Sequence, residues 1–206
     1  MSYGSQNIAV YSGSFNPLHI GHLAIIRHMI EVAGFDMVYL IVSPKNPLKD
    51  GISSDSGRER YKAAVEAVER RFLRSGLSAS GRNDSKAVEA RVKVDDIELN
   101  MPEPHYTIRT LDALKEREPD NRFTLVMGAD NLADIRRWRD YARILKEYSV
   151  AVFPREGHDL TEIKQDLLKE DPAYKIQILD AEMVDISSTQ IRNAIAEGED
   201  ISKYLM

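Results

Sequence analysis

Two histidines lie three residues apart in residues 13–22, which read G-S-F-N-P-L-H-I-G-H. The apolar residues 8–11 precede this segment, so the sequence predicts a short buried strand, a tight turn and a helix. The spacing places His19 and His22 on one face of the first helical turn. Because the N–H groups of a first turn have no partner within the helix and attract anions, the segment predicts a phosphate-binding site. The alternative is a capped helix start that carries two surface histidines.

A second candidate site is the loop S-P-K-N-P-L-K at residues 43–49, at the end of a predicted strand. Two prolines stiffen the loop, and Lys45 and Lys49 would present positive charges to an anionic substrate. Taken alone, such a loop is more often a solvated turn. Its place at the same predicted sheet edge as the histidines favours contact with phosphate.

A third candidate site lies near the end of the chain, where residues 186–192 read I-S-S-T-Q-I-R. Ser187 fits the N-cap of a helix, and Gln190 fits its partner in a capping box. Ser188 and Arg192 are four residues apart and therefore share one helical face. Hydroxyls, free N–H groups and a guanidinium together suit a triphosphate. A plain capped helix with a surface arginine is the alternative.

A fourth group of residues lies in the middle of the chain. Residues 105–111 read H-Y-T-I-R-T-L and start a predicted helix, whereas G-A-D-N at residues 128–131 ends a predicted strand. Asp130 could accept hydrogen bonds from a ribose, as acidic residues at such strand ends do. Trp138 is the only tryptophan, and two interpretations stay open, since it could pack in the core or stack on a ligand.

Alternating strands and helices must position these residues. The predicted strands are rich in Val, Ile and Leu and cover Ile8–Ser12, Met37–Ser43, Val92–Leu99, Phe123–Met127, Val150–Pro154 and Tyr174–Leu179. The predicted helices cover residues 20–33, 57–73, 107–118, 131–147, 160–169 and 188–197. This alternation predicts an α/β fold with a doubly wound parallel sheet, whose ligands bind beyond the carboxyl ends of the strands.

Composition narrows the class of protein further. A chain of 206 residues with 43% hydrophobic and 30% charged residues fits a single globular domain over residues 1–206, with a polar surface loop at residues 75–90. The net charge of −5 leaves no broad footprint for nucleic acid. The chain has no cysteine and no His/Asp/Glu cluster with the spacing of a dedicated metal site, so we predict no protein-bound metal. Neither a signal peptide nor an apolar stretch of about 20 residues is visible, so we expect a cytoplasmic protein without a membrane partner.

The candidate motifs also resemble those of a known superfamily. Residues 13–22 resemble the first signature of the nucleotidyltransferases, which transfer adenylyl or cytidylyl groups, and the H-x-G-H part is shared with class I aminoacyl-tRNA synthetases. Residues 186–192 resemble the C-terminal signature of that superfamily. Residues 105–111, followed by G-A-D and a downstream tryptophan, resemble the nicotinate mononucleotide adenylyltransferases. The resemblance extends over about residues 8–197, apart from the loop at 75–90.

Two positions depart from the family pattern. Leu48 stands where a histidine is often found, which leaves Lys49 as the matching cation. His105 replaces the Ser or Thr that usually precedes the tyrosine, so no contact through that side chain is transferred to this chain.

The resemblance implies a Rossmann-like enzyme of NAD biosynthesis that transfers the adenylyl group of ATP to nicotinate mononucleotide, with Mg²⁺ arriving on ATP. The catalytic residues that it implies are His19, His22 and Lys49. The ATP-binding residues that it implies are Gly13, Ser14, Phe15, His19, His22, Gly128, Asp130, Ser187, Ser188 and Arg192. The pyridine nucleotide-binding residues that it implies are Asn16, Lys45, Tyr106, Thr107 and Trp138. Residues 187–206 would form a small helical part that completes the ATP site.

Several alternatives stay open at this point. The acceptor could be nicotinamide mononucleotide or another phosphorylated molecule such as phosphopantetheine. A tRNA-charging module would need a basic surface, an anticodon domain and a K-M-S-K-S-like loop, none of which the sequence contains. A non-catalytic nucleotide sensor would bind ATP without releasing pyrophosphate. The sequence is compatible with a homo-oligomer and does not decide it.

Overall fold

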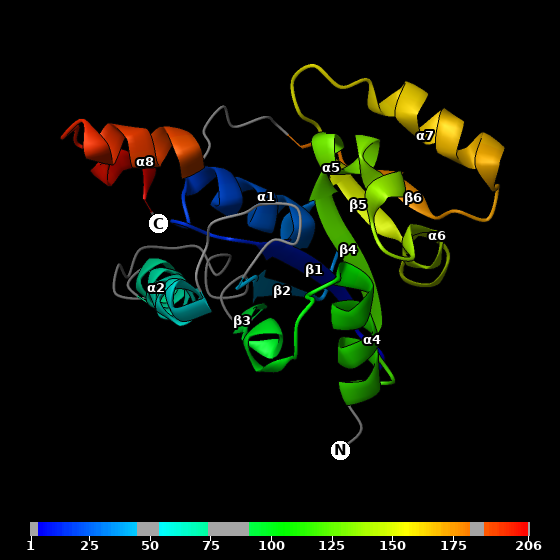
Figure 1. Ribbon diagram of the computed structural model, residues 1–206, viewed down its shortest axis with the longest axis horizontal. Coiled ribbons are helices and arrows are strands. Elements are labelled where there is room, and N and C mark those ends of the chain that lie inside the picture. Colours follow the sequence, from blue (N-terminus) through cyan, green and yellow to red (C-terminus); the bar gives the residue numbers. More distant parts are fainter. Residues whose placement is uncertain (1–3, 45–53, 74–90, 182–187, 206) are drawn as a thin grey trace.

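A computed structural model of the chain describes residues 4–44, 54–73, 91–181 and 188–205. Six parallel strands form one sheet in the order β3-β2-β1-β4-β5-β6 (Figure 1). Their bounds are β1 Asn7–Gly13, β2 Met37–Val42, β3 Val92–Asp95, β4 Arg122–Gly128, β5 Val150–Phe153 and β6 Ile176–Ile178. The strand order reverses between β1 and β4, which makes the exit of β1 the switch point where such sheets bind ligands.

Helices cover both faces of the sheet, as the sequence predicts for a doubly wound fold (Figure 1). The α-helices are α1 Ile20–Glu31, α2 Ser54–Leu73, α4 Thr107–Arg117, α5 Ala129–Ala133, α6 Tyr141–Arg143, α7 Leu160–Glu170 and α8 Ser188–Ala196. The remaining turns are the 3-10 helices η2 Ile97–Asn100, η3 Ile135–Arg137 and η5 Ser202–Tyr204, and the π-helix η4 Ile144–Tyr148. None of the described helices is both long enough and apolar enough to span a membrane.

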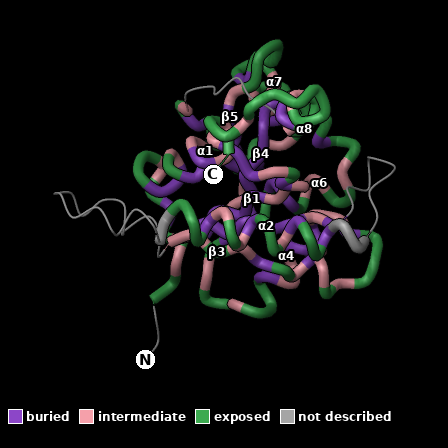
Figure 2. Tube along the Cα trace, turned by 90° about the vertical axis from the view of Figure 1, so that its left-hand side faces the viewer, coloured by how far each residue is buried: buried purple, intermediate pink, exposed green. Residues whose placement is uncertain are grey.

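The alternation of side chains along each strand builds two hydrophobic cores. In β1, Ile8 and Val10 face the core under α4 to α7, whereas Ala9 and Tyr11 face the core under α1 and α2. All four are buried, and Figure 2 shows the buried segments gathered in the central strands. Burial on both faces explains the near-continuous apolar runs by which these strands were predicted.

The predicted helix 131–147 is wrong as a single element, because the structure divides it into α5, η3, α6 and η4. Trp138 follows η3 with extended backbone angles, and Asp140 has a φ of 51° in the left-handed region. These two residues stop the helical ladder, and Trp138 and Tyr141 then pack against the core. A period of apolar residues in the sequence cannot reveal such a break.

The predicted strand Val92–Leu99 is also too long. It ends at Asp95, whose Oδ1 accepts a hydrogen bond from the N–H of Ile97 at 3.0 Å and so turns the chain into η2. The predicted polar loop at residues 75–90 lies outside the described residues.

Candidate active site

The histidine segment forms the turn between β1 and α1, directly at the switch point of the sheet. β1 ends at Gly13, and a Cβ added there would lie 3.2 Å from the ring of Phe15. Phe15 itself has a φ of 43°, a conformation that a non-glycine residue keeps only where its surroundings hold it. The turn is therefore tightly constrained before any ligand arrives.

His19 and His22 lie against each other at the start of α1, with ring centroids 3.7 Å apart. The backbone N–H of His19 donates a hydrogen bond to Nδ1 of His22 at 3.2 Å. Because Nδ1 of His22 is an acceptor, a neutral His22 ring carries its proton on Nε2. This contact leaves the Nε2–H of His22 to serve as a donor to an anion. The spacing predicted this shared face correctly.

Burial keeps both imidazoles neutral near pH 7. The side chain of His19 is 4% exposed, and burial together with the positive charge of Arg155 lowers its pKa to about 4. Burial, His19 and Arg155 also hold the pKa of His22 well below its usual range. Nδ1 of His19 is buried without a hydrogen-bond partner, an unsatisfied group that a ligand or water could satisfy.

Aromatic rings support the histidine pair from the sheet side. The ring of Phe15 packs edge-on against the ring of His22, with 5.2 Å between the ring centroids. The ring of Tyr11 packs edge-on against that of Phe15, with 5.5 Å between their centroids. Tyr11 also contacts Phe153 of β5 at 6.0 Å. Burial raises the pKa of the Tyr11 hydroxyl, so that it stays protonated. These contacts fix the imidazoles in place, which geometry-dependent catalysis requires.

The ends of β4 and β5 add three further residues beside this pair. A Cβ added to Gly128 would lie 2.4 Å from Oδ1 of Asp130 and 3.2 Å from the ring of Phe153, so a larger residue here would displace the Asp130 carboxylate. The guanidinium of Arg155 lies 5.1 Å from the centre of the Phe153 ring. The sequence analysis missed Arg155. The argument that selected Asp130, a charged side chain beyond a strand end, would also have found it.

Helix α8 contacts the same turn. The Oγ of Ser188 donates to the carbonyl of Pro17 at 3.4 Å, and Nη1 of Arg192 donates to the carbonyl of Asn16 at 2.9 Å. The C-terminal segment also reaches the turn, since Leu205 forms an antiparallel bridge with His19. The structure thus brings Ser188 and Arg192 to the turn that carries the histidines.

The predicted lysine loop carries Lys45 and Lys49, and both lie outside the described residues, as does Ser187 of the C-terminal motif. The described start of this loop contains a polar network that the sequence analysis missed. Glu98 is 2% exposed and accepts hydrogen bonds from the hydroxyls of Ser43 and Thr110. Burial raises the pKa of Glu98. No signal in one sequence distinguishes Glu98 from a surface acid.

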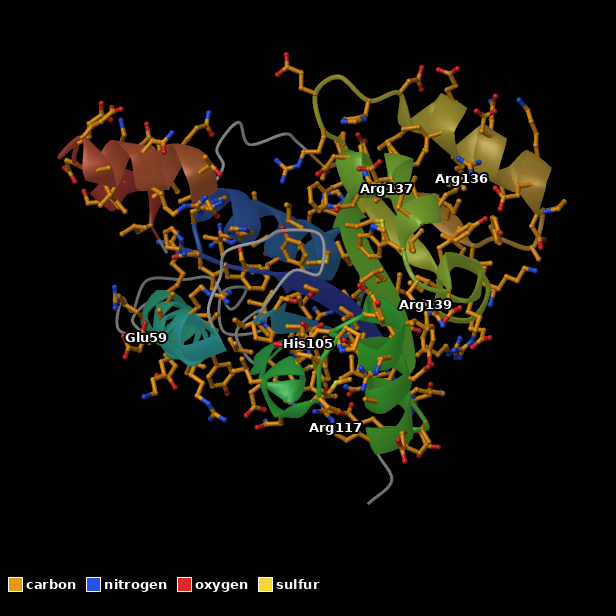
Figure 3. All side chains as sticks on the ribbon, in the orientation of Figure 1. Glu59, His105, Arg117, Arg136, Arg137 and Arg139 are labelled. Atoms are coloured by element: carbon orange, nitrogen blue, oxygen red, sulfur yellow. The ribbon has the colours of Figure 1, made fainter. Side chains whose placement is uncertain are left out.

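Two of the residues predicted to bind the pyridine lie at a pocket apart from the histidine pair. Tyr106 and Trp138 line one open pocket of about 550 Å³. The pocket is completed by Arg136, Arg137, Arg139, Asp140, Tyr141 and Ala142. Figure 3 labels its three arginines, which come from the segment between α5 and α6. Trp138 both packs against the core and lines the pocket, so the two interpretations left open are compatible. Thr107 begins α4 next to Tyr106, and Asn16 lies in the histidine turn.

The described side chains at this site do not form a cluster of metal ligands. Within the part of the chain that the structure describes, no group of three or more His, Cys, Asp or Glu residues could hold a metal ion. The site instead offers ring N–H groups, hydroxyls and guanidinium groups. Such donors suit a polyphosphate, whose oxygens and water molecules are the ligands that Mg²⁺ prefers.

Solved structures share this architecture. The Plasmodium falciparum nicotinic acid mononucleotide adenylyltransferase complexed with NaAD superposes with a TM-score of 0.70, covering 97% of this chain and 90% of that one at 20% identity. The same enzyme complexed with APC gives a TM-score of 0.66, covering 97% of this chain and 90% of that one at 20% identity. At this identity the likeness establishes the fold.

The six-stranded parallel sheet, with a histidine pair at its switch point, thus has the same fold as these adenylyltransferases. The profile of the cytidylyltransferase-like family matches residues 10–194. Probable nicotinate-nucleotide adenylyltransferases of Flavobacterium johnsoniae and Porphyromonas gingivalis are 37% and 36% identical to this chain. The matches cover 97% and 95% of this chain, and 92% and 87% of the relatives. The chain therefore belongs to the cytidylyltransferase-like family and, within it, to the nicotinate-nucleotide adenylyltransferases.

Proposed function

We propose that this protein transfers the adenylyl group of ATP to nicotinate mononucleotide, forming nicotinate adenine dinucleotide and pyrophosphate in NAD biosynthesis. The observation that carries the proposal is the neutral, buried pair of His19 and His22 at a helix start on the switch point. The names of the relatives and of the structural neighbours support the same substrate.

The reaction needs no general base. A phosphate oxygen of the mononucleotide attacks the α-phosphorus of ATP, a new phosphoanhydride bond forms, and the bond to pyrophosphate breaks. The attacking oxygen is already an anion near neutral pH, so no proton must be removed from it. Catalysis then consists of aligning two anions and stabilising the charge that develops in the transition state.

The histidines can perform that stabilisation as neutral donors. His22 would donate its Nε2–H to the α-phosphate, with His19 beside it, and the aromatic contacts fix the direction of this bond. A neutral donor is available at pH 7 although the pKa of each ring is lowered. Approach of the polyphosphate favours the charged ring and would raise both pKa values.

The remaining predicted residues complete the ATP site in this proposal. Ser187, Ser188 and Arg192 would bind the β- and γ-phosphates, and Lys49 would neutralise phosphate charge, with Lys45 towards the mononucleotide. The contacts of α8 with the turn support this placement. Gly13, Ser14 and Phe15 would shape the turn, and Gly128 and Asp130 would contact the nucleoside. Mg²⁺ bound to the ATP phosphates would supply further charge neutralisation.

The charge of the Trp138 pocket supports the acid form of the pyridine. Three arginines line it, and each lies beside a carboxylate: Arg136 is 2.9 Å from Glu170, Arg137 is 3.7 Å from Asp134 and Arg139 is 3.5 Å from Asp140. The pairs of Arg137 and Arg139 are long and exposed, so these two guanidinium groups keep a positive potential at the pocket. The pyridine carboxylate of nicotinate mononucleotide would gain from this positive potential, whereas the amide would not. Tyr106, Thr107 and Trp138 would hold the ring. We also propose a cytoplasmic location, because a chain without cysteine suits a reducing compartment.

The test is release of pyrophosphate from ATP and Mg²⁺ with nicotinate mononucleotide, beside a parallel assay with nicotinamide mononucleotide. A strong preference for the acid is expected. Equal rates would contradict the substrate assignment and keep the adenylyl transfer. No release with either would overturn the proposed reaction and direct the assay to 4′-phosphopantetheine.

A further inference from the structure

Arg60 is an unusual residue in this structure, because a charged side chain on α2 is only 6% exposed. Its Nη1 donates hydrogen bonds to the carbonyls of Ser14 at 2.6 Å and Ser43 at 2.9 Å. Its Nη2 donates to the carbonyl of Pro44 at 2.9 Å. One guanidinium therefore joins three backbone carbonyls from two separate segments.

Those two segments are the exits of neighbouring strands. Ser14 follows β1 in the turn that carries the histidines, and Ser43 and Pro44 follow β2. The exits also contact each other directly, since the N–H of Ser43 donates to the carbonyl of Gly13 at 3.0 Å. Arg60 thus holds together the starts of the histidine turn and of the lysine loop.

Helix α2 is docked closely enough to keep Arg60 in this position. A Cβ added to Gly57 would lie 3.1 Å from Cα of Pro44, so a side chain here would push the helix and the exit of β2 apart by a few tenths of an ångström. Gly57 is one helical turn before Arg60, so both contact the same exit.

The electrostatics of Arg60 are costly for the free protein. Its described partners are neutral carbonyls, and its Nε is buried without a hydrogen-bond partner. No described carboxylate forms an ion pair with it, and burial lowers its pKa. A buried charge with no countercharge among the described residues is unfavourable unless something else requires it. An anion bound at the adjacent turn would be such a requirement.

We propose that Arg60 is a positioning residue that fixes the histidine turn against the exit of β2. The guanidinium of Arg60 fixes the backbone at Ser14 and thereby the positions of His19 and His22. The consequence for catalysis rests on the proposed function, whereas the clamp itself does not. Lysine at this position would keep the charge but could not reproduce the planar fork that reaches both segments.

The first test compares Arg60→Lys with Arg58→Lys, the same change at an exposed position of the same helix. We expect kcat/KM for ATP to fall about 100-fold in Arg60→Lys, since a displacement of about 1 Å at a catalytic group has such an effect. Arg58→Lys should stay within about twofold of the unchanged protein. Unchanged kcat/KM in Arg60→Lys would overturn the proposal.

The second test needs no substrate. Amide hydrogen exchange on the free protein should accelerate in residues 13–15 and at residues 42 and 43 of Arg60→Lys, and not in Arg58→Lys. Leu167→Val in α7 controls for general loss of stability, because it trims a buried side chain of the other core. Uniform acceleration along the chain, or none in these segments, would overturn the clamp. If the unchanged protein lacks adenylyl transfer, the proposed function fails while this exchange experiment still decides the role of Arg60.

Discussion

The histidine turn and the Trp138 pocket form the two ends of the proposed site, and they differ in how exposed their ionisable side chains are. At the histidine turn, His19 is 4% exposed, and burial together with the positive charge of Arg155 keeps the imidazoles neutral. In the Trp138 pocket, the side chains of Arg137 and Arg139 are 69% and 67% exposed. Their nearest carboxylates lie 3.7 Å and 3.5 Å away, at distances typical of loose surface pairs.

This difference implies different physical roles. Buried, fixed donors act strongly on a nearby phosphate because little solvent screens them. Exposed arginines attract an anion through a screened field, so each contributes little and salt weakens it. We therefore expect geometry to control turnover at the histidine end, and charge to control substrate preference at the pyridine end.

The largest effect should follow from His22→Ala. If the Nε2–H of His22 donates to the transferred phosphate as proposed, its removal should lower kcat by about 10²–10³-fold, the usual result of deleting one transition-state donor. The matched control is His158→Ala, which removes an exposed histidine beyond β5. Pyrophosphate release under saturating substrates measures both. Near-normal turnover of a folded His22→Ala protein would contradict the assignment of His22.

Trp138→Ala should act on binding rather than on turnover. Loss of the stacking surface should raise KM for the pyridine mononucleotide about tenfold, with kcat changed far less. Trp138→Phe keeps an aromatic face and should restore most of the affinity. Because Trp138 also packs against the core, thermal unfolding of both variants must accompany the kinetics. A fall in kcat with unchanged KM would remove the distinction between the two ends.

Arg137→Ala combined with Arg139→Ala should reduce the preference for the acid over the amide. The expected change in the ratio of kcat/KM values is about two- to fivefold, since exposed charges contribute little each. Arg58→Ala combined with Arg122→Ala, at two exposed positions outside the pocket, removes the same two charges and is the control for net charge. About 0.5 M salt should diminish the difference between variant and unchanged protein. A preference insensitive to both changes would show that backbone groups, not these arginines, select the acid.

The features that could be predicted from the sequence are those formed by residues that lie close together in the chain. The histidine turn needs only one strand, one turn and one helix start, all within residues 7–22, and its geometry follows from that short stretch. Ser188 and Arg192 were also found, because their motif is equally local. The sheet followed from the alternation of apolar strands with helices, and the strand order places the turn at the switch point.

Features that depend on distant contacts escaped prediction. Arg60 lies in a helix rich in charged residues, and only the fold brings it to Ser14, 46 positions away. Glu98 lay within an expected strand, whereas it is buried on η2 between Ser43 and Thr110. The break at Asp140 depends on how Trp138 packs, which no period in the sequence encodes.

The last prediction concerns the contribution of the histidine turn to the pH dependence of stability. The pKa of His19 is about 4 in the folded protein and near its ordinary 6.5 in the unfolded chain. Between these values the unfolded chain binds a proton that the folded protein does not. The free energy of unfolding should therefore fall as pH is lowered from 6.5 towards 4, and His22 acts in the same direction.

Urea unfolding at several pH values measures this contribution. In His19→Gln the free energy of unfolding should decline less between pH 6.5 and pH 4. The reason is that the variant lacks one group whose pKa is lower in the folded protein than in the unfolded chain. Arg139→Ala in the Trp138 pocket should leave the slope parallel to that of the unchanged protein, whatever its absolute stability. If the free energy of unfolding changes with pH equally in His19→Gln and in the unchanged protein, the pKa of His19 is the same in the folded protein and in the unfolded chain. The histidine turn would then be solvated like the arginine pocket, and the contrast between the two ends would disappear.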